Sequence, residues 1–121
     1  MNYKELGMLG ENAAADFLCR KKGYTIVCRN YRSSAGEIDM IAQDGNTLVF
    51  VEVKTRKTTE YGRPAEAVER RKQHKIAIMA KSYLARYGLW SMPCRFDVVE
   101  VMPDCRTGFV INHIIHAFIL Q

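Results

Sequence analysis

The chain has 121 residues, of which 48% are hydrophobic, and it carries a formal net charge of +5. This length and composition indicate a single domain over residues 1–121 with a sizeable core, and they exclude a chain built from repeats or low-complexity segments. No apolar run approaches the length of a membrane span, and the N-terminus has the pattern of a charged amphipathic helix. We therefore expect a cytoplasmic protein with no membrane partner.

The first predicted element is a helix over residues 3–22, which ends before Gly23. Its apolar stripe repeats at helical spacing and consists of Leu6, Leu9, Ala13 and Phe17. Glu11 lies on the flank of this stripe, where its neighbours on the same face are small or apolar residues, namely Gly7, Ala14 and Leu18. A solvated glutamate rarely has such neighbours, which favours a functional role for Glu11. The alternative is that Glu11 is an ordinary exposed residue on the flank of the helix.

The remaining elements alternate in type along the chain. Period-two patterns and turn residues predict strands over residues 25–32, 37–43 and 47–55. A second helix is expected from Pro64 to Tyr87, and two more strands over residues 95–102 and 109–119, with a turn from Pro103 to Gly108. The order α-β-β-β-α-β-β makes the second helix a crossover connection. It predicts an α/β (α+β-like) domain with a central mixed sheet of about five strands flanked by helices.

The second and third strands carry charged side chains where strands normally bury aliphatic ones. A two-residue loop at Gly45-Asn46 would set Asp39 opposite Glu52, whereas a loop at Asp44-Gly45 would make these residues diagonal neighbours. In either register Asp39, Glu52 and Lys54 share one face, because side chains alternate with period two. A three-residue loop would instead separate the two carboxylates.

Two carboxylates on a half-buried sheet face repel each other unless a cation lies between them. Mg²⁺ typically takes one or two protein carboxylates together with water and phosphate oxygens. The ammonium of Lys54 could orient a water molecule or neutralise charge on a phosphate oxygen, which suggests metal-assisted hydrolysis of a phosphodiester. The alternative from spacing alone is a solvated edge hairpin with Glu52 and Lys54 as an exposed pair.

Asp39 followed by Glu52-Val53-Lys54 resembles the D…(D/E)xK core of the PD-(D/E)xK, or restriction-endonuclease-like, nuclease superfamily. Ile38 stands where the superfamily name has proline. The chain more closely resembles the bacterial YraN-like family, an uncharacterised protein family similar in layout to archaeal Holliday-junction resolvases. Motifs along nearly the whole chain carry this resemblance: Gly10-Glu11, Asn30-Tyr31-Arg32, Gly36-Glu37-Ile38-Asp39, Val51-Glu52-Val53-Lys54-Thr55-Arg56, Pro64-Ala65-Glu66-Ala67-Val68 and Arg95-Phe96-Asp97-Val98-Val99.

The resemblance implies a restriction-endonuclease-like core and a role for each residue of the motif. Asp39 and Glu52 would be metal ligands together with the Val53 carbonyl, and Lys54 would position the attacking water. Glu11 would reach the metal directly or through water. The implied protein is a Mg²⁺- or Mn²⁺-dependent endonuclease acting on DNA, including branched or junction DNA, and a homodimer. The alternative is a non-catalytic module on the same fold that binds nucleic acid or another protein.

Basic residues follow the acidic strand and continue into the second helix. Their position beside the acidic cluster favours contact with a nucleic-acid backbone, whereas their composition alone favours a solvated helix face. The candidate nucleic-acid-binding residues are Arg32, Arg56, Lys57, Arg63, Arg71, Lys72 and Lys75.

Three further titratable residues lie in the last two predicted strands. Asp97 is expected to form a salt bridge with Arg95 or a neighbouring arginine rather than to join the acidic site. His113 and His116 are interpreted as structural or surface residues.

Overall fold

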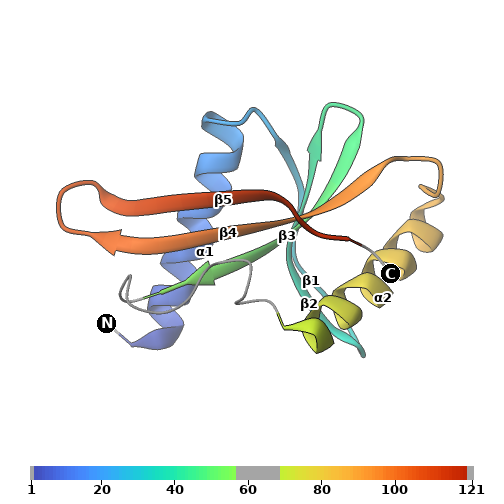
Figure 1. Ribbon diagram of the computed structural model, residues 1–121, viewed down its shortest axis with the longest axis horizontal. Coiled ribbons are helices and arrows are strands. Elements are labelled where there is room, and N and C mark those ends of the chain that lie inside the picture. The colour runs from blue at the N-terminus through green and yellow to red at the C-terminus, as the bar shows by residue number, and fades with distance from the viewer. Residues whose placement is uncertain (1, 57–68, 120–121) are drawn as a thin grey trace.

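The computed structural model describes residues 2–56 and 69–119, and it confirms the predicted order of elements (Figure 1). The elements are α1 (Tyr3–Arg20), β1 (Thr25–Ser33), β2 (Gly36–Asp44), β3 (Thr47–Thr55), α2 (Arg70–Tyr87), β4 (Cys94–Asp104) and β5 (Gly108–Phe118). Neither helix in this part of the chain is long and apolar enough to cross a membrane.

The strands form one five-stranded sheet in the order β1-β2-β3-β4-β5. Only β3 and β4 run parallel, because α2 carries the chain between them, and the other neighbours are antiparallel. The predicted mixed sheet is therefore confirmed.

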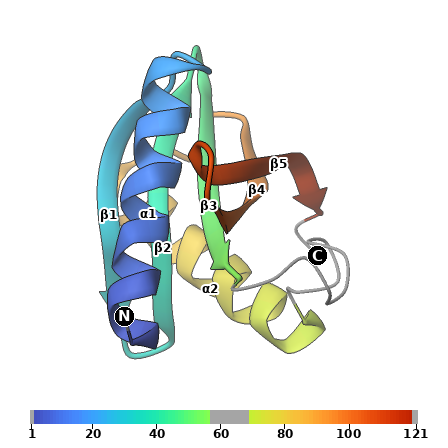
Figure 2. The ribbon, with the colours of Figure 1, turned by 90° about the vertical axis from the view of Figure 1, so that its left-hand side faces the viewer.

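The two helices cover opposite faces of this sheet, as Figure 2 shows. Leu18 of α1 belongs to one core cluster with Val51 of β3, whereas Met79 of α2 belongs to the other cluster with Phe50. Because β3 is buried on both faces, its sequence is almost continuously apolar, and the charged Glu52 and Lys54 interrupt it near its end. A mixed sheet with one helix on each face is the α/β architecture that the sequence predicts.

The buried face of α1 differs from the predicted stripe. It consists of Leu6, Gly10, Ala14 and Leu18, whereas Leu9 is 41% exposed. The reason is a close approach of α1 to β3: a Cβ atom added at Gly10 would lie 2.0 Å from the Thr55 hydroxyl. The helix therefore turns its glycine, rather than its largest apolar residues, toward the end of the strand.

This close approach predicts opposite effects for two glycines of α1. Gly10→Ala should lower the free energy of unfolding by about 1–3 kcal/mol, because the new methyl group must push the helix away from Thr55. Gly7→Ala is the matched control, since nothing lies within 4 Å of its added Cβ. It should raise stability by about 0.5–1 kcal/mol through helix propensity. Urea unfolding of both variants measures the difference, and equal effects would contradict the close approach.

Two predicted boundaries are wrong. The described helix α2 begins at Arg70 rather than at Pro64, because Glu69 has extended backbone dihedrals of φ −60° and ψ 154°, while Pro64 itself lies outside the described residues. Strand β4 continues through Pro103 instead of turning there. The last pair between β3 and β4 is Thr55 with Val101, so Pro103 has only β5 as its neighbour and its missing amide hydrogen costs no bond to β3.

Candidate active site

The β2–β3 hairpin sets the position of the two central carboxylates. Its backbone pairs run from Asp44 with Thr47 to Met40 with Val51, which corresponds to a two-residue loop at Gly45-Asn46. Just beyond the last pair, the side chains of Asp39 and Glu52 contact each other. Of the two registers that the sequence allows, the structure therefore has the one that brings these carboxylates together, on the face that α2 covers.

Asp39 is held in place by the strand opposite. Its Oδ2 atom accepts a hydrogen bond of 2.8 Å from the backbone amide of Val53, just beyond the last backbone pair of the hairpin. Burial, and then the negative charge of Glu52, raise the pKa of Asp39 to about 7. Without a bound cation, the carboxyl group therefore retains its proton far more readily than an ordinary aspartate.

Glu52 is almost completely buried, with 4% of its surface exposed. Its Oε1 atom pairs with the Nζ atom of Lys72 at 2.5 Å. Its Oε2 atom is buried and, among the described residues, lacks a donor other than the protonated Asp39 carboxyl group, which shares a side-chain hydrogen bond with Glu52. Because an unpaired buried carboxylate oxygen is costly, Glu52 needs either that proton or a cation.

Two lysines approach the carboxylates from different elements. Lys54 follows Glu52 by two residues on β3 and lies on the same face of the sheet. Burial, and then the charge of Lys72, lower the pKa of Lys54. Burial also acts to lower the pKa of Lys72, but the hydrogen bond and charge of Glu52 outweigh it and raise that pKa. Lys54 is thus the more easily deprotonated of the two.

Glu11 lies close enough to Asp39 to feel its charge, and Asn30 links it to Glu37. The Nδ2 atom of Asn30 donates to Oε1 of Glu11 at 3.0 Å and to Oε1 of Glu37 at 2.7 Å. Burial raises the pKa of Glu11, the hydrogen bond from Asn30 opposes this shift, and the charge of Asp39 adds to it. Within residues 2–56 and 69–119, however, no three His, Cys, Asp or Glu side chains are placed to hold one metal ion. Glu11 thus borders the Asp39–Glu52 pair.

Asn30 is a site residue to which the sequence analysis assigned no role. Its φ of 54° places it in the left-handed region, which asparagine tolerates better than most residues. Asparagine is also depleted in strands, and this residue interrupts β1 between the paired residues Arg29 and Tyr31. The asparagine inside a strand pattern is the sequence feature that could have pointed to a functional role for this position.

The residues present fit a hard divalent cation. Asp39 and Glu52 supply carboxylate oxygens, and the Val53 amide fixes the orientation of Asp39. Burial, and then the charge of Glu52, raise the pKa of Asp39, and a cation bound to both carboxylates would offset both effects.

The candidate nucleic-acid-binding residues fall into three groups. Arg71, Lys72 and Lys75 line a hollow of about 330 Å³ beside the start of α2. Arg32 is exposed and pairs with Glu37 at 3.2 Å, whereas the largely buried Arg56 pairs with Glu100 at 2.5 Å. Lys57 and Arg63 lie outside the described residues.

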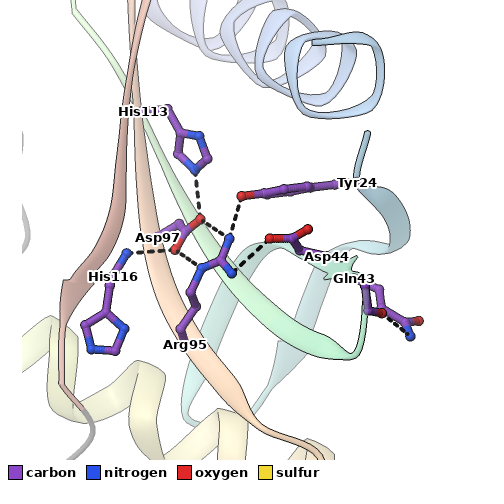
Figure 3. A network of polar contacts seen from close by, with 8 residues as sticks. Tyr24, Gln43, Asp44, Arg95, Asp97, His113 and His116 are labelled. Carbon is purple, nitrogen blue, oxygen red and sulfur yellow. Dashed lines mark hydrogen bonds and ion pairs between the residues drawn. The ribbon is translucent and has the colours of Figure 1, made fainter. Parts of the chain in front are cut away.

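A second polar network lies on the α1 face, away from the carboxylate pair (Figure 3). The predicted salt bridge is confirmed: Arg95 Nε lies 3.0 Å from Asp97 Oδ1, and Arg95 Nη1 lies 3.1 Å from Asp44. His113 Nε2 lies 2.8 Å from Asp97 Oδ2, and the His116 amide also donates to Asp97. Burial acts to raise the pKa of Asp97, but the bonds to His113 and Arg95 outweigh it and lower that pKa. Because Arg95 is its counter-ion, Asp97 is stable in its ionised form and has a structural role.

Comparisons with known proteins agree with the motif pattern. A family model described as "Uncharacterised protein family UPF0102" matches residues 10–101. The UPF0102 protein STH1475 of Symbiobacterium thermophilum is 57% identical over 100 residues, which cover 83% of this chain and 84% of that protein. A UPF0102 protein of Caldicellulosiruptor saccharolyticus is 44% identical over 119 residues, covering 98% of this chain and 100% of the relative. Among solved structures, Pyrococcus furiosus SfsA in complex with Ca²⁺ aligns with a TM-score of 0.45 and 12% identity, over 84% of this chain and 61% of that one.

Proposed function

This chain belongs to the uncharacterised protein family UPF0102, the YraN-like family that its motifs resemble, and we propose that it is a Mg²⁺- or Mn²⁺-dependent endonuclease acting on DNA. The observation that carries this proposal is the Asp39–Glu52 pair, two carboxyl groups in side-chain contact beside the ammonium of Lys72. Branched or junction DNA is the proposed substrate class. Cutting a symmetric junction requires two such sites, so we also propose a homodimer.

Each residue of the site has a distinct proposed role. Asp39 and Glu52 hold the cation together with the Val53 carbonyl, and the Val53 amide keeps Asp39 aimed at it. Once bound, the cation would supply charge neutralisation at a phosphate oxygen and a more acidic water molecule. Lys54 orients the attacking water from the same face of β3, and its lowered pKa suits a group that exchanges protons with that water. Glu11 supports the site from α1.

The exposed basic residues provide a path for the DNA backbone. Arg71 and Lys75 line the hollow on α2 that also contains Lys72, and Arg32 pairs with Glu37, another residue of its lining. Contacts of this kind position a nucleic acid without reading its sequence.

One observation favours a second candidate, a non-catalytic module on the same fold. The ion pair between Lys72 and Glu52 already satisfies half of the buried carboxylate without any metal. If this pair is permanent, the acidic cluster is a structural element and the basic surface binds nucleic acid or another protein without turnover.

Cleavage assays with defined DNA substrates test the proposal. End-labelled linear, single-stranded, flapped and four-way DNA should be incubated with the full chain and Mg²⁺ or Mn²⁺. We expect metal-dependent cleavage that disappears with EDTA, with Lys54→Ala protein as the contamination control. Metal-independent binding of DNA without turnover would instead support the non-catalytic module.

The pKa of Asp39 predicts how metal affinity changes with pH. Because a cation must displace the proton that Asp39 retains up to about pH 7, its apparent affinity should fall about tenfold for each pH unit below 7 and level off above it. Titration calorimetry with Mn²⁺ at three pH values measures this dependence, and buffers of different ionisation enthalpy report the released proton. An affinity that does not change between pH 6 and 8 would contradict the role of Asp39 as a ligand.

A further inference from the structure

Lys72 lies inside the carboxylate cluster, whereas its sequence context places it on a basic helix face. We propose that the Lys72 ammonium is the built-in counter-ion of the carboxylate pair, and that it gives up Glu52 to an incoming divalent cation and turns to the substrate phosphate. This inference rests on the proposed function, because it describes how the same site is regulated. The movement of Lys72 would make metal binding and DNA binding cooperative.

The geometry allows Lys72 to leave and Glu52 to stay. The Glu52 side chain is 5% exposed and comes from the centre of the sheet, between β2 and β4. The Lys72 side chain is 40% exposed and comes from the first turn of α2, so it enters the cluster from the solvent side. A rotation of its flexible stem withdraws the ammonium without moving the backbone.

The charge balance favours withdrawal of one ammonium. Above about pH 7, where Asp39 is ionised, the charges of Asp39 and Glu52 balance those of Lys54 and Lys72. A divalent cation would raise the formal charge of these four groups to +2 in a half-buried place, where like charges repel strongly, and withdrawal of the Lys72 ammonium would lower it to +1. Lys54 is attached to a central strand two residues from Glu52, which makes Lys72 the group that can withdraw.

The position of Lys72 on its helix supports a functional reason for its charge. Arg70, Arg71 and Lys72 begin α2, and the first turn contains no acidic residue. The positive end of the helix dipole disfavours cations there, so this basic turn lowers helix stability. The N-cap residue Glu69 makes no side-chain cap hydrogen bond that would offset the cost. The ion pair with Glu52, rather than helix stability, therefore accounts for a lysine at this place.

The hollow beside α2 provides the second position for the ammonium. Lys72 lines this hollow together with Arg71 and Lys75 and with the acidic residues Glu37 and Glu69. An ammonium that leaves Glu52 therefore enters a hollow with three cationic and two acidic side chains. There it would be free to contact a phosphate of the bound substrate, a contact that it cannot make while it is paired with Glu52.

Metal titration of charge-removed variants tests the inference without measuring cleavage. Lys72→Met keeps the length of the stem and removes the charge, and Lys81→Met, at an exposed position of the same helix, is the matched control. Calorimetry with Mn²⁺ and the full chain near pH 8, without DNA, should show roughly tenfold tighter binding for Lys72→Met and less than about twofold change for Lys81→Met. Lys72→Gln, whose amide can still donate to Glu52, should also bind Mn²⁺ more tightly and serves if the methionine variant is poorly folded.

The outcomes separate this inference from the proposed function. Wild-type protein that binds Mn²⁺ while both Lys72 variants bind it equally or more weakly would overturn the inference and leave the metal site intact. No Mn²⁺ binding in wild type or variants would overturn both. In the supporting case, Mn²⁺ should also strengthen the binding of wild-type protein to uncleavable phosphorothioate DNA, and this gain should be lost in Lys72→Met.

Discussion

Asp39→Asn should abolish metal-dependent cleavage of DNA and at the same time stabilise the metal-free protein near pH 8. Asparagine can still accept the hydrogen bond from Val53, but it cannot contribute the charge that a cation requires. We expect cleavage to fall by about a thousandfold or more, because a catalytic metal supplies several kcal/mol of transition-state stabilisation. Radiolabelled cleavage assays under single-turnover conditions measure this loss.

The accompanying gain in stability follows from the pKa of Asp39. At about pH 4 the carboxyl group is protonated in the folded chain and about half protonated in the unfolded chain, so the variant should be only slightly more stable than the wild type. Between about pH 4 and 7 the unfolded chain releases its proton while the folded chain keeps it, because the pKa in the folded state is raised to about 7. Rising pH therefore destabilises the wild type but not the variant.

Urea unfolding at several pH values measures this difference. The gain from Asp39→Asn should grow from near zero at about pH 4 to the order of 1–2 kcal/mol at about pH 8. Mg²⁺ should reduce this difference in the free energy of unfolding, because it stabilises only the wild type. A variant that is less stable than the wild type near pH 8 would identify Asp39 as a structural residue and contradict the metal-ligand role.

Lys54→Met should remove catalysis while leaving metal binding intact. If Lys54 orients the attacking water, its loss should lower the single-turnover rate by about 10²- to 10⁴-fold, the usual contribution of a positioned proton-transfer group. Mn²⁺ affinity should stay the same or increase, because the variant removes a positive charge beside the carboxylates.

Single-turnover cleavage, DNA affinity and Mn²⁺ calorimetry on the same preparation separate these effects. Lys4→Met, an exposed position at the start of α1, is the control for the loss of one lysine charge and should cleave at the wild-type rate. A Lys54→Met protein that cleaves at full rate would assign the water-positioning role to another group.

The fold and the centre of the site could be predicted from the sequence because the determining signals are local. Period-two alternation and the Gly45-Asn46 turn predict the β2–β3 hairpin, and any two-residue loop there keeps Asp39 and Glu52 on one face. The sequence could not choose between the two registers, since both turns are compatible with its glycine. The tertiary contacts of the hairpin decide that choice.

The parts that could not be predicted depend on contacts between distant segments. Lys72 and Arg56 both belong to a basic run, yet Lys72 pairs with Glu52 and Arg56 pairs with Glu100. Asn30 contacts Glu11 only because α1 and β1 meet in the folded chain. Gly10 is buried because α1 meets Thr55. Charge pattern and periodicity contain no information about such partners.

The ion pair between Asp44 and Arg95 fixes the register of the β2–β3 hairpin at its turn. Asp44 is the last residue of β2, and its carboxylate is anchored to β4, about 17 Å along the strand from Asp39 at the usual rise per residue. A slip of one residue there would break this ion pair and turn the preceding side chains of β2 to the opposite face. The alignment of Asp39 with Glu52 thus depends on an ion pair at the other end of β2. Substitutions near the turn can therefore inactivate the site although Asp39 and Glu52 are unchanged.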